Sequence, residues 1–198
     1  MKGSERHIAR LLDAWKEGDT VYLVLEYYSI TLKKLLEKAK KAMLEDEDVV
    51  RMSYSLIAAL NFLHSAGVMH RDIKPANLLV DKDFRIRICD FGLSRSTLTS
   101  EISKEVKIAP KAQQKENSKK NEIRKRSLSN HICSRYYRPP EVILLERKYA
   151  EPVDIWSSGC ILLEIVSSTK SYIGDDPEKG DRVAFKGASC HPLTPPPQ

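Results

Sequence analysis

One short segment in the middle of the chain combines side chains that can accept a proton, neutralise an anion and bind a metal ion. It reads His70-Arg71-Asp72-Ile73-Lys74-Pro75-Ala76-Asn77, and Asp90-Phe91-Gly92 follows shortly after it. A carboxylate such as Asp72 can accept the proton of an attacking hydroxyl, and Lys74 can offset charge on a moving phosphoryl group. The amide oxygen of Asn77 and the carboxylate of Asp90 are hard ligands that suit Mg²⁺. These types predict magnesium-dependent phosphoryl transfer, with Asp72, Lys74 and Asn77 catalytic and with Asn77 and Asp90 holding the metal.

The flanking segments must supply the elements that position these residues. Apolar side chains recur at three- and four-residue spacing before Gly67, which predicts a helix with one buried face, capped by Asp46 or Asp48. Leu78–Val80 and Arg85–Ile88 predict a tight hairpin that turns at Asp81–Asp83 and folds Asp90 back over Asn77. We also expect two strands, the second an inner one, and two more helices. Their ranges are His7–Ala14 and Val21–Glu26 for the strands, and Leu32–Lys41 and Pro152–Ser168 for the helices.

The motifs HRDIKPAN and DFG resemble the catalytic loop and the magnesium-binding loop of protein kinases. The resemblance implies an α+β, two-lobed kinase fold with an incomplete small β lobe and a mostly helical large lobe that lacks its last helices. It implies ATP and Mg²⁺ as cofactors. The backbone of Glu26 and Tyr28 would hydrogen-bond adenine, Leu79 would floor the adenine pocket, and Leu25 would be the gatekeeper.

The same resemblance assigns roles around the catalytic loop. Asp154 would brace the backbone of this loop, and the hydroxyl of Ser134 would contact Asp72 and Lys74. Arg71 would meet a phosphate on the activation segment.

The segment SRYYRPPEVILLERKYAEPVDIWSSGCILLEI, which begins at Ser134, resembles the mitogen-activated and cyclin-dependent kinases. It implies a serine/threonine kinase that acts on proteins with Ser/Thr-Pro sites and is switched on by an upstream activating kinase. Arg138 occupies the position that, in this group, makes the kinase prefer substrates with proline directly after the phosphorylated residue. The group's activating T-x-Y is replaced by Ser129-Asn130-His131, so we expect Ser129 alone to be phosphorylated and to pair with Arg71.

Compared with that family pattern, the glycine-rich loop, the ATP-binding lysine and the last helices are missing from these 198 residues. We therefore expect a truncated product or an incomplete gene model. Its parts would be a remnant of the small lobe and hinge at 1–28, a large catalytic lobe at 29–168 with a disordered insertion at about 97–126, and a loop-like tail at 169–198. Two functions stay open: an active kinase, or a catalytically impaired kinase fragment that acts as a binding module.

Composition limits the partners and the location. A hydrophobic content of 41% in 198 residues suffices for one sizeable core. The sequence contains no run of about 18 apolar residues, so we expect no membrane span. Of the net charge of +6, the stretch between Glu101 and Arg126 carries +5 (nine basic and four acidic residues), and it is poor in aromatic residues. Such a stretch favours a solvated insertion over a nucleic-acid surface. The scattered cysteines suit a reducing compartment, and we expect a cytoplasmic protein whose basic segment can serve as a nuclear signal.

Overall fold

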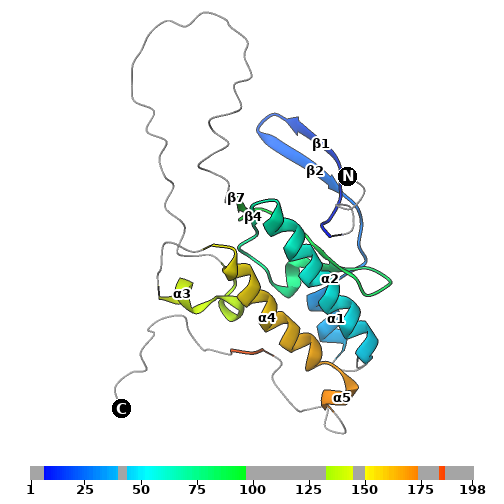
Figure 1. The fold of residues 1–198 in the computed structure, drawn as a ribbon. Coiled ribbons are helices and arrows are strands. Elements are labelled where there is room, and N and C mark those ends of the chain that lie inside the picture. Colours follow the sequence, from blue (N-terminus) through cyan, green and yellow to red (C-terminus); the bar gives the residue numbers. More distant parts are fainter. Residues whose placement is uncertain (1–6, 40–43, 97–132, 145–149, 174–182, 186–198) are drawn as a thin grey trace, which may run out of the picture.

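The computed structural model describes residues 7–39, 44–96, 133–144, 150–173 and 183–185 (Figure 1). The predicted α+β composition is confirmed. The strands are β1 (Leu11–Glu17), β2 (Thr20–Leu25), β3 (Ile30–Thr31), β4 (Val68–Met69), β5 (Leu78–Val80), β6 (Ile86–Ile88) and β7 (Arg95–Ser96). The helices are α1 (Leu32–Lys38), α2 (Asp46–Ser65), α3 (Pro140–Ile143), α4 (Pro152–Val166) and α5 (Lys170–Ile173), with short 3₁₀ helices at Pro75–Asn77 and Arg135–Tyr137.

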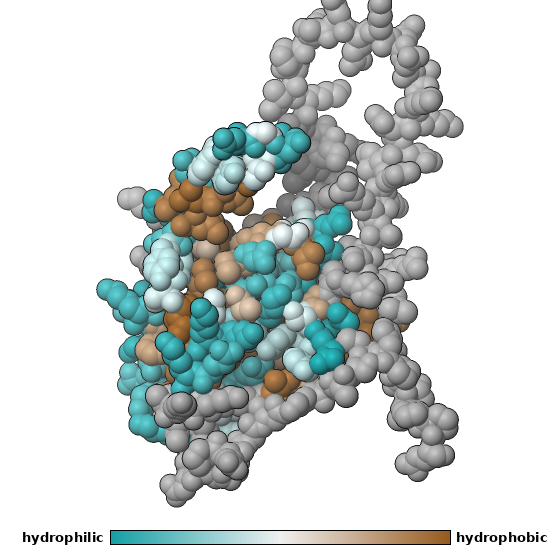
Figure 2. Space-filling model, turned by 180° about the vertical axis from the view of Figure 1, so that it is seen from behind, coloured by the Kyte–Doolittle hydropathy of each residue, from teal (hydrophilic) through white to brown (hydrophobic). Residues whose placement is uncertain are grey.

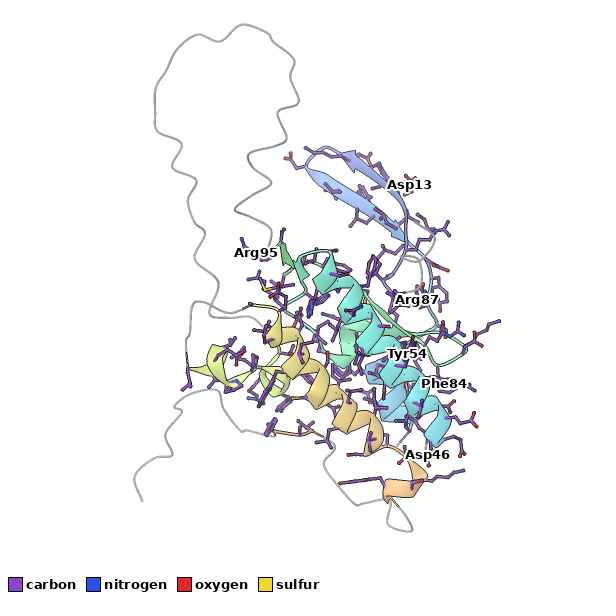
Figure 3. The ribbon with its side chains drawn as sticks, in the orientation of Figure 1. Asp13, Asp46, Tyr54, Phe84, Arg87 and Arg95 are labelled. Carbon is purple, nitrogen blue, oxygen red and sulfur yellow. The ribbon has the colours of Figure 1, made fainter. Side chains whose placement is uncertain are left out.

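Three small antiparallel sheets connect these elements. β1 pairs with β2, β5 lies between β3 and β6, and β4 pairs with β7. The β1–β2 hairpin stands apart from the body formed by α1, α2, α4 and the β3–β5–β6 sheet (Figure 1). Asp13 on this hairpin and Asp46 at the start of α2 mark opposite ends of that arrangement, and Arg87 of β6 lies between them (Figure 3).

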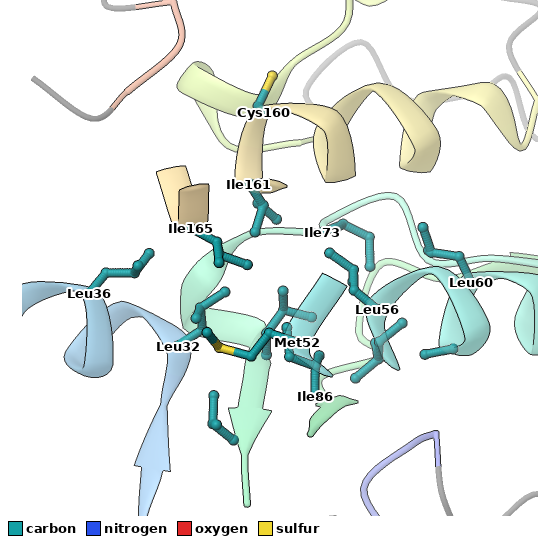
Figure 4. Packing of buried hydrophobic residues seen from close by; sticks show 14 of the residues in the cluster. Leu32, Leu36, Met52, Leu56, Leu60, Ile73, Ile86, Cys160, Ile161 and Ile165 are labelled. Atoms are coloured by element: carbon teal, nitrogen blue, oxygen red, sulfur yellow. The ribbon is translucent and has the colours of Figure 1, made fainter. Parts of the chain in front are cut away.

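The hydrophobic core lies where α2, α4, α1 and the β5–β6 hairpin meet. Met52 and Leu56 of α2, Ile161 of α4 and Leu32 of α1 are fully buried in one cluster (Figure 4). Ile73, from the middle of the chemistry-bearing segment, is buried in the same cluster. The core therefore holds the segment directly, because the large apolar side chain of Ile73 packs among the core residues.

The prediction that Val21–Glu26 is an inner strand is wrong. β2 pairs only with β1 among the described residues, and every residue of both strands is exposed. Val21 and Leu23 are each 61% exposed. Apolar side chains gather on this hairpin in the space-filling view (Figure 2). The apolar pattern predicted the strand correctly but not its burial. Burial requires a covering layer, and the described residues do not supply one over this hairpin.

The first strand also begins later than the predicted His7–Ala14. Residues 7–9 instead join β6 in a parallel bridge: the Ala9 N–H donates to the Ile88 carbonyl at 2.8 Å, and the Ile88 N–H donates to the His7 carbonyl at 3.0 Å. Both stretches are extended, so the sequence pattern could not separate them. β1 begins only at Leu11.

The ends of α2 are partly as predicted. Gly67 has a φ of +66° and follows the last turn, as expected of a residue that stops a helix. Neither Asp46 nor Asp48 is the cap, because Glu45 holds that position without a side-chain hydrogen bond. Asp46 lies in the first turn, where an acidic side chain is favourable, and accepts the hydroxyl of Ser171 at 2.8 Å.

The other helices differ from their predicted ranges at the C-terminal ends. α1 ends at Lys38 rather than Lys41, and α4 ends at Val166 rather than Ser168. The stretch expected to be loop-like from 169 begins with the short helix α5 at Lys170–Ile173. The expected insertion at about 97–126 lies outside the described residues. No helix in the described part of the chain is long and apolar enough to cross a membrane.

Candidate active site

A buried carboxylate on α4 holds the start of the chemistry-bearing segment. Asp154 is fully buried, and its side chain accepts the backbone N–H of His70 at 2.8 Å and that of Arg71 at 2.7 Å. His64, near the end of α2, contacts the same carboxylate at 3.0 Å through Nε2. The predicted bracing by Asp154 is confirmed in its geometry, and it joins α2, α4 and this segment at one point.

His70 is buried beneath the segment and has a defined tautomer. Its Nδ1 accepts the N–H of Asp72 at 3.3 Å, so Nε2 carries the proton and donates to the Cys89 carbonyl at 3.0 Å. The ring meets Phe91 edge-on, with centroids 5.1 Å apart. Burial lowers the pKa of His70 below its ordinary 6.5. A neutral imidazole therefore links the segment to the backbone of Cys89, the residue before Asp90.

Three donors converge on the carboxylate of Asp72. Lys74 Nζ lies 2.6 Å from Asp72 Oδ2, and Asn77 Nδ2 donates to the same oxygen at 3.1 Å. Ser134 Oγ donates to Asp72 Oδ1 at 3.3 Å. The predicted contact of the Ser134 hydroxyl with Asp72 is thus present, whereas its predicted contact with Lys74 is not among the hydrogen bonds of the described residues, where Lys74 Nζ donates to Asp72 instead. Lys74 reaches Asp72 because the backbone at Lys74 is extended, which places the two side chains on one side.

The β5–β6 hairpin brings Asp90 beside Asn77, as the sequence predicts. Asp81 closes the turn by accepting the N–H groups of Asp83 at 2.9 Å and Arg85 at 3.0 Å. At the open end, the Cys89 N–H donates to the Asn77 carbonyl at 3.0 Å, so the next residue, Asp90, begins at that point.

The side chains of Asn77 and Asp90 fit a magnesium ion. Both N–H donors of the Asn77 amide face Asp72, which leaves its oxygen Oδ1 as the ligand atom. Asp90 is exposed and has a φ of +63°, and a Cβ at Gly92 would lie only 3.2 Å from its Oδ1. In the described part of the chain, no group of three or more His, Cys, Asp and Glu side chains can hold a metal. Two oxygen ligands suit Mg²⁺, which keeps waters and binds substrate phosphates.

Two of the residues expected to contact adenine, Glu26 and Tyr28, follow β2 at the base of the β1–β2 hairpin. The Glu26 N–H donates to the Arg10 carbonyl at 2.9 Å, which leaves the Glu26 carbonyl as the atom that can face a ligand. The Tyr28 hydroxyl donates to Glu26 Oε2 at 3.0 Å, and the Arg87 guanidinium lies 5.6 Å from the Tyr28 ring centre. Leu79 is half-buried on β5, where it pairs with Arg87. Leu25, the expected gatekeeper, ends β2 and is exposed.

Arg71 is buried and already bonded. Its Nε donates to the Leu93 carbonyl at 2.6 Å, which ties the segment to the residues after Gly92. The predicted partner of Arg71, phosphorylated Ser129, lies outside the described residues.

Sequence reasoning missed one neighbour of the segment. The Cys133 N–H donates to the Arg71 carbonyl at 3.0 Å. Burial raises the pKa of Cys133 to about 12. No local pattern marks Cys133, since its partner Arg71 is distant along the chain.

Comparison with known proteins gives a family that covers most of the chain. The family model described as protein kinase domain matches residues 1–189. The mitogen-activated protein kinase KSS1 of Saccharomyces cerevisiae is 34% identical over 160 residues, which are 80% of this chain and 39% of KSS1. The mitogen-activated protein kinase HOG1 of Wallemia muriae is 32% identical over 171 residues, which are 86% of this chain and 51% of HOG1. The chain thus spans about two-fifths of one relative and half of the other.

A solved structure agrees with these sequence matches. A chain in the crystal structure of the yeast RNA Pol II CTD kinase CTDK-1 complex superposes with a TM-score of 0.63 at 26% identity. The match covers 83% of this chain and 46% of that one.

We predict that Asp154→Ala lowers the free energy of unfolding by about 3–5 kcal/mol, because it leaves two buried N–H groups without an acceptor. Asp154→Asn keeps one acceptor oxygen, so its cost should be smaller. Urea denaturation followed by circular dichroism measures both. Glu47→Ala is the control, since it removes an exposed carboxylate that pairs with Arg51. Equal losses for Asp154→Ala and Glu47→Ala would contradict the bracing role.

A second prediction concerns pH. The folded chain depresses the pKa of His70, so the unfolded chain binds more protons once the pH falls below the ordinary 6.5. Stability should therefore hold above that pH and decline below it. The urea midpoint of the wild type should fall between about pH 7.5 and about pH 5.5 by more than that of His70→Gln, which cannot titrate. Identical declines in the two proteins would show that other groups cause the effect.

Proposed function

Because the chain belongs to the protein kinase family, we propose that it carries an ATP-dependent protein serine/threonine kinase activity that is proline-directed. The family and the resemblance to mitogen-activated protein kinases are as the sequence predicts. The observation that supports the activity best is the Asp72 carboxylate, which accepts Lys74 at 2.6 Å, Asn77 at 3.1 Å and the Ser134 hydroxyl at 3.3 Å.

Asp72 would accept the proton of the substrate hydroxyl. The Ser134 hydroxyl donates to Asp72 Oδ1 at 3.3 Å, so this oxygen accepts the same chemical group that a serine or threonine substrate presents. Lys74 places a positive charge 2.6 Å from the Asp72 carboxylate and thus beside the reacting oxygen. Asn77 fixes the orientation of the carboxylate through its amide N–H groups.

Asn77 Oδ1 and the Asp90 carboxylate would hold Mg²⁺ in this proposal. Leu79 would form the floor under adenine, and the backbone of Glu26 and Tyr28 would meet its edge. Mg·ATP, when bound, supplies the phosphoryl group and the cation that neutralises its charge. The chain's own residues would hold the phosphoryl group in one orientation relative to the substrate hydroxyl.

The relatives support the substrate class and the regulation. KSS1 and HOG1 are mitogen-activated protein kinases. We propose that this chain has the same class of activity and that it is directed to Ser/Thr-Pro sites. Arg138 donates to the Cys133 carbonyl at 3.0 Å, next to Ser134 and thus close to where a substrate hydroxyl would lie. The proposal includes an upstream kinase that phosphorylates Ser129, whose phosphate would then pair with Arg71.

A second candidate is a binding module derived from a kinase. It is favoured by the exposed apolar side chains of the β1–β2 hairpin, among them Val21 and Leu23. A contiguous apolar surface of this kind is typical of a site that a protein partner covers. This candidate requires no phosphate transfer.

The experiment is transfer from labelled Mg·ATP to paired peptides that carry Ser-Pro or Ser-Ala. We expect transfer to the Ser-Pro peptide, and a loss of at least about 100-fold in Asp72→Asn, which removes the proton acceptor. Asp83→Asn, at an exposed aspartate of the β5–β6 turn, is the matched control and should retain the activity.

Other outcomes separate the candidates. Transfer that is equal in the wild type and in Asp72→Asn would reject the kinase proposal. Transfer without preference for Ser-Pro would reject only the proline-directed part. A higher melting temperature with Mg·ATP and no transfer would favour the binding module.

A further inference from the structure

Two thiols lie at the two ends of the segment that carries Asp72 and Asn77. At one end the Arg71 carbonyl accepts the Cys133 backbone N–H at 3.0 Å and the Cys133 thiol at 3.2 Å. At the other end the Asn77 carbonyl accepts the Cys89 backbone N–H at 3.0 Å and the Cys89 thiol at 3.3 Å. The same pair of donors, from one cysteine, thus meets the carbonyl at each end.

We propose that the thiols of Cys89 and Cys133 are positioning residues that hold the two ends of the segment 71–77. They touch neither a substrate nor a metal in this proposal. They act through the backbone, whose course sets where Asp72, Lys74 and Asn77 point. The effect on phosphate transfer rests on the proposed kinase function, but the effect on the backbone does not.

The backbone at these points needs additional support. Arg71 and Cys133 have φ values of +68° and +58°, and Asp90, next to Cys89, has +63°. Residues with a Cβ are strained in this region, and such strain persists only where the surroundings fix the conformation. A carbonyl has two lone pairs, so each thiol adds a second donor where the backbone N–H already occupies the first.

The environment of Cys133 favours a hydrogen-bond donor over a reactive group. Its side chain is buried, and burial keeps its pKa near 12, so the sulfur retains its proton. Cys160 shows the other role of a buried cysteine. It is equally buried but belongs to the apolar core on α4, beside Ile161 (Figure 4).

Cys160 therefore provides the matched control for a substitution series. In Cys133→Ala and Cys89→Ala, amide hydrogen exchange of peptides covering 70–78 should be about two- to fivefold faster than in the wild type, the range expected for one weak hydrogen bond. Cys160→Ala removes the same atom from the core and should leave this exchange unchanged. Cys133→Ser and Cys89→Ser keep a donor and should restore protection. Equal exchange in Cys133→Ala, Cys89→Ala and Cys160→Ala would overturn the proposal.

Kinetics provides a readout that a general loss of stability would not reproduce. Cys133→Ala loosens the Asp72 end and should lower kcat with little change in KM for Mg·ATP. Cys89→Ala loosens the Asn77 end and should raise that KM. A fall in kcat alone, identical in both variants, would indicate a smaller folded fraction and reject the positioning roles. If the wild type transfers no phosphate, the kinase proposal fails, and hydrogen exchange alone still decides the role of the thiols.

Discussion

The arrangement of the site depends on one buried carboxylate. Removing Asp154 from water is costly unless donors replace the lost hydration, and three groups do so: two successive backbone N–H groups, from His70 and Arg71, and the ring of His64. To present both N–H groups to one side chain, the backbone must turn sharply, and Arg71 adopts a φ of +68°. Asp72 follows at once, so the direction of its carboxylate is fixed by a residue on α4.

Residues in the left-handed region gather around this point. Arg71, Asp90 and Cys133 each carry a side chain in a conformation that costs about 1–3 kcal/mol. Two of them are held by bonds to another part of the chain: Arg71 by Asp154, and Cys133 by the Arg71 carbonyl. Packing in the core thus stabilises backbone conformations that an unconstrained loop would seldom adopt. Ile73, inside the segment, is fully buried and anchors the segment to this core.

Residue types and spacing alone predicted what depends on neighbouring residues, whereas the distant contacts of Asp154 and Ser134 were predicted only through the resemblance to protein kinases. Asp72, Lys74 and Asn77 meet because they are separated by a few residues of extended and 3₁₀ backbone, and the turn at Asp81 brings Asp90 back. The thiol of Cys133 could not be foreseen, since it meets Arg71 across 62 positions of the sequence. The prediction of the α2 cap was wrong for a similar reason. Its acidic residues were interchangeable in sequence, and contacts with Lys170 and Ser171 distinguish them only in the fold.

The two sides of the site are supported unequally. The side that carries Asp72 and Asn77 rests on the core through Ile73 and Leu78, both fully buried. The side that would meet adenine lies at the base of the β1–β2 hairpin, whose strands are exposed throughout. That hairpin joins the body through backbone bonds such as those between residues 7–9 and Ile88. The groups proposed to act on a substrate hydroxyl are therefore preorganised by packing, whereas the position of Glu26 depends on how the hairpin is held. Any factor that covers the apolar face of β1–β2 would act on nucleotide binding before it acted on the geometry of Asp72.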